Sequence, residues 1–549
     1  MDLITKVLYR LSLFTSPQLD LYVPATTDCV VTPVNYTSVV DICPSPGYIE
    51  AGQTADLPPD IARLVSFFND SECLTPGCIQ SAADIYSNLD ETADPCEDFY
   101  QFACGNWMDK RFIPDYNSKT SVLYDTQSSF YTKLKNLLQE DVTEKEPYFI
   151  QLVKTLYQSC MDTGALNSEP LKSVLKNFGR WPVVEGEKWN STSFDWLETL
   201  IQLRESGFSH NTLMSLSVTE DPQDSLVNII ELGEPSLGVD CEFLKIGLND
   251  SNTANYFNKM LTAANYLGVN RSTSEHELRK ALEFEIMLAN FCSPHEQREN
   301  MYYTVDELIN DIQPQIDWLK LFNGLLNDQI FENETVIVKN VDFVRKFADF
   351  ITKAEKRTVA NYMMWRVVKE SLPLLSSAWT NLQDNPQRTR WKYCFSTVNK
   401  NLGIALASYY LQNYFDEESQ AKALKIFEYI QEEVYNMLEN IDWMDFQTNV
   451  KAKEKVIGMR AYFQYPTKLL NNTYVSDLYA GLTFSNETYF DKEMIVKKWS
   501  TDISFSKLRK FNTLEEKKKR VRTVFNPLGN SNGFPELFVF PLFIKDRTA

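Results

Sequence analysis

The chain has 549 residues, of which 44% are hydrophobic and 13% aromatic, and it carries a formal net charge of −20. This length is more than one hydrophobic core normally supports, so we expect two or more domains. The apolar content is that of a folded protein rather than a disordered one. The acidic balance argues against nucleic acid or an anionic membrane surface as the main partner, because either would repel the protein.

Cysteines and glycosylation sequons both indicate an oxidising, extracellular compartment. The ten cysteines are even in number and widely spaced, as disulfides are, and no two form a CxxC metal-binding pair. Eight Asn-x-Ser/Thr sequons agree, although several would occur by chance in a chain so rich in asparagine. The sequons begin at Asn35, Asn69, Asn190, Asn249, Asn270, Asn333, Asn471 and Asn486. We therefore expect a secreted protein or the ectodomain of a plasma-membrane protein.

The first residues do not settle whether the protein is secreted or is a membrane-anchored ectodomain. Leu3–Leu13 is apolar but is interrupted by Lys6 and Arg10, so it is too short and too charged to span a bilayer. It also lacks a clear apolar region followed by a cleavage site. Either the export signal lies upstream of Met1 or the start is unusual.

Residues 20–60 predict an extended stalk, because they are rich in Pro, Thr, Val and Ser and contain no Lys or Arg. A disulfide between Cys29 and Cys43 would close this stalk on itself. The turn from Cys73 to Cys78 contains Pro and Gly, so its ends can approach and a local disulfide is expected there. A helix follows over about residues 79–89.

A second short helix is predicted over residues 94–107. Asp94 is suited to cap it, Glu97 to complete a capping box, and Gly105 to end it. Its predicted buried face combines aromatic rings with two thiols. That face comprises Cys96, Phe99, Tyr100, Ala103, Cys104 and Trp107. In an oxidising compartment the two cysteines would have partners elsewhere in the chain.

Apolar residues at helical spacing dominate the rest of the chain. The predicted helices are 147–161, 196–203, 254–267, 274–291, 304–312, 341–351, 357–372, 402–414, 417–438 and 453–463. Strand patterns are few. They cover 226–230, 335–338 and 537–540. The expected fold class is mainly α.

Several short blocks together resemble the neprilysin and endothelin-converting-enzyme family of zinc metallopeptidases. They occur in that family's order, from about residue 70 to residue 543. The blocks begin at Cys73, Asp94, Leu156, Asn361, Trp443 and Lys451. Each block alone is modest support, but the ordered set is specific.

The resemblance implies a large helical lobe that covers a thermolysin-like α+β catalytic lobe, which is incomplete in this chain. Substrate peptides would lie in the cavity between the two lobes. The implied divisions are a tail or stalk over 1–60, the start of the catalytic lobe over 61–125, the helical lobe over 126–445 and a truncated return to the catalytic lobe over 446–549.

Two substrate-contacting positions follow from the resemblance. Lys119 stands where the family often has an arginine for the substrate's C-terminal carboxylate, and a lysine there would lack bidentate geometry. A solvated lysine on a loop is an equal alternative. Arg522 and Thr523 stand at the first two positions of the family's Asn-Ala-x-Tyr motif, which binds substrate backbone from an edge strand. The change of both residues puts that role in doubt.

The zinc-binding motif of the family is absent from the sequence. The motif needs two histidines at i and i+4 on one helix with a glutamate between them, and a third ligand later in the chain. Only His210, His276 and His295 are present, and no two are four residues apart. A GxSxG match at Gly529–Gly533 is interpreted as a turn, because Pro535 opposes a helix and no histidine follows it. We predict no metal or catalytic residues in this chain, and zinc as the cofactor of the complete family enzyme.

By the family pattern Cys73 pairs with Cys78, and Cys160 with Cys394. We also predict that Cys241 pairs with Cys292. In the family, the counterparts of Cys96 and Cys104 bond to cysteines near the far C-terminus, which do not occur here. Eight residues of helix separate these two by about 12 Å, too far for a mutual disulfide. Three alternatives remain for them. They stay free, pair with Cys29 or Cys43, or form intermolecular bonds.

Two functions are weighed. The first is a neprilysin-like metalloendopeptidase acting on extracellular peptides, represented by a fragment, splice form or degenerate copy that is inactive as this chain. The second is a secreted, non-catalytic homologue that binds peptides or small proteins. In either case the expected partners are peptides or small proteins and not nucleic acid. Membrane association would come only through a segment not seen here.

Overall fold

The computed structural model describes residues 76–113, 120–224, 226–293, 300–312, 315–383, 389–414, 417–462, 467–512, 524–526 and 536–538. The chain divides into two units, residues 1–79 and residues 80–549. The account below concerns the second unit, apart from the first residues of one helix that starts at Pro76. Lys119, His295, Arg522 and Thr523 lie outside the described residues.

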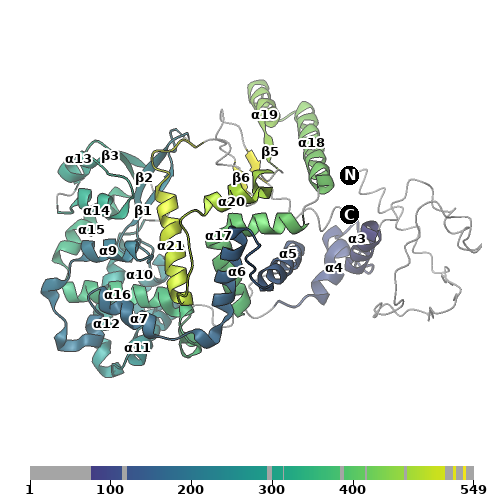
Figure 1. Cartoon of the computed structure of the whole chain (residues 1–549). Helices are drawn as coiled ribbons and strands as arrows, with labels where there is room; N and C mark the ends of the chain where they lie inside the picture. The colour runs from purple at the N-terminus through teal and green to yellow at the C-terminus, as the bar shows by residue number, and fades with distance from the viewer. Residues whose placement is uncertain are drawn as a thin grey trace, which may run out of the picture. The chain divides into compact units, whose positions relative to one another are not determined.

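The fold is mainly α, as predicted (Figure 1). In the N-terminal half the α-helices are α3 (Pro76–Asn88), α4 (Phe99–Lys110), α5 (Val122–Gln139), α6 (Tyr148–Met161), α7 (Glu169–Asn177), α8 (Pro182–Glu185), α9 (Trp196–Glu205), α10 (Cys241–Ile246), α11 (Ser251–Tyr266) and α12 (Arg271–Phe291). In the C-terminal half they are α13 (Val305–Glu307), α14 (Trp318–Leu325), α15 (Val341–Lys353), α16 (Lys356–Ser371), α17 (Arg390–Tyr414), α18 (Glu417–Glu439), α19 (Phe446–Gly458), α20 (Asn472–Leu478) and α21 (Tyr489–Phe505). A π-helical segment, Leu308–Ile312, continues α13.

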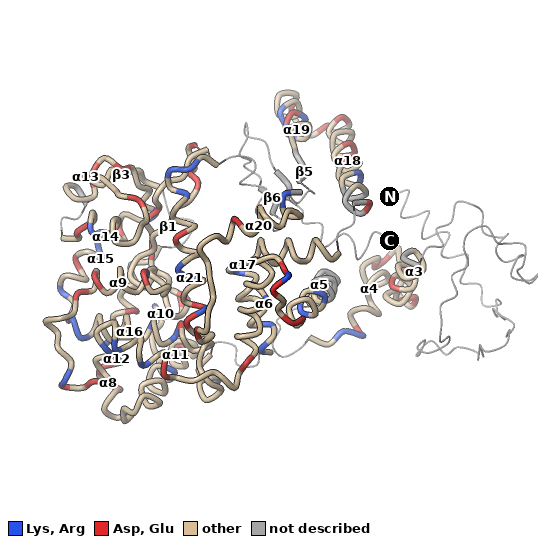
Figure 2. The backbone as a smooth tube through the Cα atoms, viewed as in Figure 1, with Lys and Arg blue, Asp and Glu red and all other residues tan. Residues whose placement is uncertain are grey.

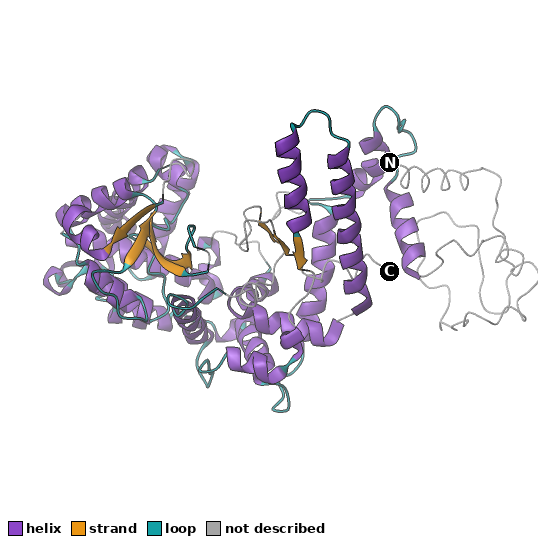
Figure 3. Ribbon diagram, turned by 90° about the horizontal axis from the view of Figure 1, so that it is seen from above, coloured by secondary structure: helices purple, strands orange, loops and turns teal. Residues whose placement is uncertain are grey.

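Two small sheets accompany the helices (Figure 3). The first contains β1 (Ser215–Glu220), β2 (Asn228–Gly233), β3 (Met301–Thr304) and β4 (Thr335–Val338), in the order β1-β2-β4-β3. Its central pair β2 and β4 is parallel, and Ile230 lies opposite Val336 there. The outer strands β1 and β3 are antiparallel to their neighbours. The second sheet contains β5 (Arg460–Tyr462), β6 (Val524–Asn526) and β7 (Glu536–Phe538), in the order β5-β7-β6.

Aspartate caps explain where several helices begin. Asp195 accepts a hydrogen bond from the Glu198 N–H at 2.8 Å, and Asp317 and Asp445 make the equivalent bonds at the starts of α14 and α19. Each of these carboxylates satisfies an N–H group that the first helical turn leaves without a partner.

The predicted helix over residues 94–107 is wrong at both ends. Asp98, not Asp94, caps α4, because the Asp94 side chain instead accepts the Cys96 N–H at 2.8 Å within a preceding turn. Gly105 does not stop the helix, which continues to Lys110. Gly105 is its one buried residue, and a Cβ there would meet the side chains of Gln101 and Asp90.

The predicted buried face of that helix is also wrong. Phe99 is 51% exposed and Tyr100 is 66% exposed, and Cys96 is exposed as well.

Other boundaries differ because of contacts distant in sequence. The helix predicted over 453–463 begins earlier, at Phe446, and ends at Gly458, after which the chain enters β5. The strand predicted over 226–230 starts at Asn228 and extends to Gly233, and the one over 537–540 is instead Glu536–Phe538. β1, β3 and helix α21 were not predicted, and α17 begins twelve residues before the predicted Leu402.

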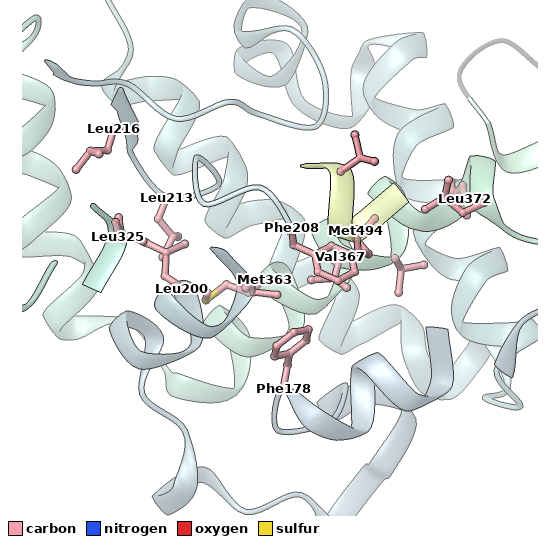
Figure 4. Close-up of a cluster of buried hydrophobic side chains, with 14 of the residues drawn as sticks. Phe178, Leu200, Phe208, Leu213, Leu216, Leu325, Met363, Val367, Leu372 and Met494 are labelled. Carbon is pink, nitrogen blue, oxygen red and sulfur yellow. The ribbon is translucent and has the colours of Figure 1, made fainter. Parts of the chain in front are cut away.

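A large core joins α9, α16 and α21 with the segment between α9 and β1. Figure 4 shows Leu200 of α9, Met363 and Val367 of α16, and Met494 of α21 directed toward the same apolar cluster as Phe208. All five are buried. Helix α21 therefore packs within the helical core, against α6 and β1, although it lies far along the chain from both.

A disulfide closes the longest loop within this unit. Cys160 at the end of α6 is bonded to Cys394 in α17, a sequence separation of 234 residues, and both are fully buried. This is the pair that the family resemblance implies. The helices it joins also pack extensively on each other.

Helices α18 and α19 form a hairpin. The Gln431 amide of α18 donates to the Val456 carbonyl of α19 at 2.6 Å, and the two helices pack on each other. Acidic and basic positions are mixed along the helices of the described chain rather than separated into two regions (Figure 2).

Candidate functional site

His210 is a structural histidine and not a metal ligand. It is buried in the segment before β1, where its Nε2 lies 3.0 Å from the Leu216 carbonyl and its ring packs against Phe505 at 5.3 Å. Burial lowers the pKa of this imidazole, because the charged form would lose its hydration. The ring nitrogen that faces Leu216 is engaged by backbone, so the side chain is not free to bind zinc through it.

His276 is exposed on α12 and also lacks partners for metal binding. The adjacent Glu277 carboxylate is occupied, since Arg357 contacts both of its oxygens at 2.9 Å and the Asn361 amide donates to it at 3.0 Å. Glu277 is thus a structural link between α12 and α16.

The described residues do not fit a zinc site. Nowhere in the described part of the chain do three His, Cys, Asp or Glu side chains gather in a way that could hold a metal ion. The sequence also contains no two histidines four residues apart.

The predicted substrate-contacting residues lie outside the described ranges, but a neighbouring strand is described. Strand β6 begins at Val524, directly after Thr523, and ends at Asn526. Among the described strands it pairs with β7 alone, and it therefore forms one edge of the sheet β5-β7-β6. Its other edge is formed by β5, which pairs with β7 in parallel.

The cysteines fall into three groups. Cys78 is disulfide-bonded to a residue outside the described ranges, where Cys73 also lies. Cys96, in the turn before α4, and Cys104, within α4, are free thiols. Cys241 and Cys292, which we predicted as a disulfide, are free thiols that lie next to each other.

A buried ion pair fixes the loop between β2 and α10, residues 234–240. The Arg366 guanidinium lies 3.3 Å from the Glu285 carboxylate, which is fully buried, and it also donates to the Ser236 carbonyl at 2.7 Å. The same carboxylate accepts the Gly238 N–H at 2.6 Å. The pair therefore binds two backbone groups of the loop. Nearby, burial raises the pKa of Tyr362, which donates to the Thr212 carbonyl at 2.8 Å.

A second, partly buried polar cluster joins α16 to α21. The Lys497 ammonium lies 3.0 Å from Glu370 and 3.8 Å from Glu493, and Glu370 also accepts the Ser209 N–H at 3.0 Å. Burial raises the pKa of Glu493. Burial opposes the charge of Lys497 too, but the two carboxylates outweigh it and its pKa is raised.

Both clusters contain residues that the sequence analysis missed. Glu285 interrupts the apolar face of α12, between Leu282 and Leu288, and a charged residue in such a position signals a buried partner. Glu493 occupies a similar position on α21. Arg366 belongs to one of the family-like blocks, but its partner was not identifiable from the sequence.

A hollow of about 220 Å³ lies between the end of α6 and the start of α21, but its lining carries no catalytic arrangement. The Ser159 hydroxyl donates to the Thr155 carbonyl at 2.8 Å, so no base activates it as a nucleophile. Lys492, which also lines the hollow, donates to the Glu487 carbonyl.

Comparison with known proteins gives the family. Residues 95–466 match the model of peptidase family M13. Neprilysin-2 of Drosophila melanogaster is 30% identical over 471 residues, which are 80% of this chain and 60% of that protein. Membrane metallo-endopeptidase-like 1 of Mus musculus is 29% identical over 514 residues, 86% of this chain and 67% of that protein. The chain thus spans about two thirds or less of these relatives' lengths.

Solved structures agree on the fold. The cryo-EM structure of the zinc metalloprotease Zmp1 of Mycobacterium tuberculosis in its open state superposes with a TM-score of 0.65 at 18% identity, covering 82% of this chain and 70% of that one. PepO from Lactobacillus rhamnosis HN001 superposes with a TM-score of 0.65 at 17% identity, covering 82% and 71%. From the family match and the ordered sequence blocks, the chain belongs to peptidase family M13, the family of the neprilysins.

Proposed function

We propose that residues 1–549 form the helical, substrate-enclosing part of an extracellular zinc metalloendopeptidase and do not cleave peptides by themselves. The proposal rests on the contrast between the family match and the missing histidine pair. The match to family M13 covers residues 95–466, yet the chain has no pair of histidines that could begin an HExxH motif. The catalytic metal would therefore need ligands that these residues do not contain.

Peptide binding is supported by the edge strand β6. An edge strand exposes N–H and C=O groups on its outer side, and an extended peptide can pair with them. The family's Asn-Ala-x-Tyr motif lies on such a strand. Arg522 and Thr523, at its first two positions, directly precede β6, and Phe525 within β6 stands at the tyrosine position.

The role of this segment can be tested by substitution. We expect Arg522→Ala to weaken the binding of an unstructured, fluorescein-labelled peptide about fivefold, since a hydrogen bond to a peptide group is worth roughly 1 kcal/mol. Asn526→Ala, at the last residue of β6, is the matched control and should bind normally. Fluorescence anisotropy measures both. Unchanged binding by the Arg522 variant would contradict the assignment.

An extracellular location is supported by the positions of the sequons. All six sequon asparagines within the described ranges are exposed. Three of them, Asn190, Asn270 and Asn471, cap a helical turn through Oδ1, which leaves the amide nitrogen for a glycan. The Cys160–Cys394 disulfide also favours an oxidising compartment. Within the described ranges, every helix falls short of the length or the hydropathy that a bilayer span requires.

Two measurements test the proposed function. Purified residues 1–549 should contain no stoichiometric zinc by plasma mass spectrometry and show no chelator-sensitive hydrolysis of fluorogenic peptides. Chelator-sensitive cleavage by this chain would contradict the proposal.

Reading the transcript past the codon for Ala549 separates the two functions weighed from the sequence. A frame that continues into HExxH and a later Glu-x-x-x-Asp would support the enzyme. A stop codon in well-supported message would instead favour a secreted protein that binds peptides without cleaving them.

A further inference from the structure

Cys241 and Cys292 meet where the start of α10 packs on the end of α12. The Cys241 sulfur lies 3.1 Å from the Ala289 carbonyl and the Cys292 sulfur lies 3.4 Å from the Leu288 carbonyl. Because these two carbonyls are consecutive on α12, the sulfurs occupy one turn of that helix, and they also hydrogen-bond to each other. Both are half-buried and line a surface hollow of about 330 Å³.

The two thiols differ in reactivity. The hydrogen bond from Cys292 lowers the pKa of Cys241, and the positive charge of Lys245 acts in the same direction. The pKa of Cys292 is raised, first by its hydrogen bond with Cys241 and then by burial. Cys241 is therefore the sulfur that forms a thiolate more readily, and a thiolate is the species that attacks a disulfide.

We propose that Cys241 and Cys292 form a disulfide by exchange with a small-molecule disulfide, for which oxidised glutathione is the probe. Cys241 loses its proton and its sulfur attacks one sulfur of oxidised glutathione, breaking that S–S bond and releasing one glutathione thiolate. Cys292 then loses its proton and attacks the Cys241 sulfur of the mixed disulfide, releasing the second glutathione. Two protein thiols are oxidised, one glutathione disulfide is reduced, and the two protons pass to the released thiolates.

The bond would clamp the end of the loop of residues 234–240. This loop is already held by Arg366 at the Ser236 carbonyl and by Glu285 at the Gly238 N–H. Gly238 lies so close to the Tyr256 hydroxyl that a Cβ there would overlap it.

Cys241 directly follows the loop, and Cys292 precedes Ser293, whose N–H donates to Glu234 at 2.9 Å at the loop's other end. A disulfide would therefore join both ends of the loop to one point on α12.

The pairing is tested by mass spectrometry on the full chain of 549 residues. Reduced protein is equilibrated with oxidised and reduced glutathione, alkylated under denaturing conditions and digested. We expect a peptide linking Cys241 to Cys292, with alkylation of both cysteines only after reduction. Alkylation of both before reduction, or a link from either to another cysteine, would overturn the proposal. Because oxidation is done in vitro, the result does not depend on where the protein resides in the organism.

The clamp is tested by hydrogen exchange of residues 234–240. The Cys241→Ser/Cys292→Ser double variant is compared with the oxidised wild-type protein. We expect exchange in this loop to be at least tenfold faster in the variant and its Tm to be several degrees lower, since the variant lacks the cross-link. Cys96→Ser, which replaces an exposed thiol in the turn before α4, is the matched control. It should change neither the exchange rate of the loop nor the Tm.

If the double variant does not fold, the wild-type protein supplies the same comparison. Mild reduction should open the half-buried Cys241–Cys292 bond and spare Cys160–Cys394, whose cysteines are fully buried. Equal exchange of the loop before and after that selective reduction would overturn the clamp.

Discussion

Two tryptophans from family-like blocks have opposite environments. Trp365 of α16 is fully buried, stacks on Trp181 with ring centroids 6.4 Å apart and meets Tyr256 edge-on at 5.6 Å. Trp443, in the bend between α18 and α19, is 76% exposed, and the nearby Phe446 is 83% exposed.

The difference shows that a residue of a family-like block is buried only where other helices pack around it. Helix α16 is surrounded by α7, α8, α9 and α12, so almost every side chain on it is covered. The α18–α19 hairpin uses only its inner face, and Ile430, Met437 and Ile457 on its outer surface are each more than half exposed. The first region is a self-sufficient core, and the second carries apolar surface that no described element covers.

The largest predicted effect compares the two tryptophans directly. Trp365→Ala should reduce the free energy of unfolding by about 4 kcal/mol, because it leaves a cavity in a packed core. Trp443→Ala should change it by less than about 0.5 kcal/mol, as exposed substitutions do. Urea denaturation followed by circular dichroism measures both. Similar losses from the two variants would show that the hairpin's outer surface is covered.

Ion pairs give the next comparison. Arg366→Met should cost about 3 kcal/mol, because it leaves the fully buried Glu285 carboxylate without its counter-charge. Lys451→Met on α19 breaks a pair with Glu454 whose side chains are 78% and 53% exposed, and it should cost under about 0.5 kcal/mol. Adding Glu285→Leu to the Arg366 variant should restore part of the loss. No recovery in the double variant would mean that Arg366 acts mainly through the loop backbone.

Two glycines distinguish the cost of a steric overlap from the cost of an unfavourable backbone conformation. Gly207 and Gly481 both have positive φ, of 86° and 84°, which other residues adopt at a cost. A Cβ at Gly207 would also overlap the Met494 carbonyl of α21, whereas nothing lies within 4 Å of one at Gly481. We expect Gly207→Ala to cost about 2 kcal/mol, and Gly481→Ala about 1 kcal/mol from conformation alone. Thermal unfolding tests this, and equal losses would mean that α21 shifts to make room.

The smallest effect concerns pH. Burial places the pKa of folded His210 below its usual value of 6.5, so the unfolded chain binds the proton more readily. The stability associated with neutral His210 is therefore present above about pH 6.5 and declines as pH falls toward the folded-state pKa. His210→Gln should flatten the pH dependence of unfolding in this range. His276→Gln, at an exposed position on α12, should leave it unchanged, and an equal response of both variants would contradict the assignment to His210.

Helices with a continuous apolar period were predictable, and those defined by distant contacts were not. The limits of α6 and α18 follow from the apolar spacing over 147–161 and 417–438. In contrast, β5 exists because β7 pairs with it from more than 70 residues away, which no local pattern encodes. At α4 the sequence analysis named Asp94 as the cap, but Asp94 binds the preceding turn and Asp98 caps the helix.

For the candidate site, the sequence shows which motif residues are present and not how they are brought together. The missing histidine pair can be seen from the sequence alone, since the motif has fixed spacing. The Glu285–Arg366 pair could not be assigned, because its members are 81 residues apart and meet only through the packing of α12 on α16.

The Cys160–Cys394 bond has a consequence for how this protein responds to cleavage. Any single cut between residues 160 and 394 leaves two pieces that remain one covalent molecule, so a protease could nick the helical region without releasing a fragment. Such a nicked form would keep its full mass on a non-reducing gel and separate into pieces only after reduction. Limited proteolysis of this protein therefore has to be followed on reducing gels, where each exposed loop in that span can be mapped in turn.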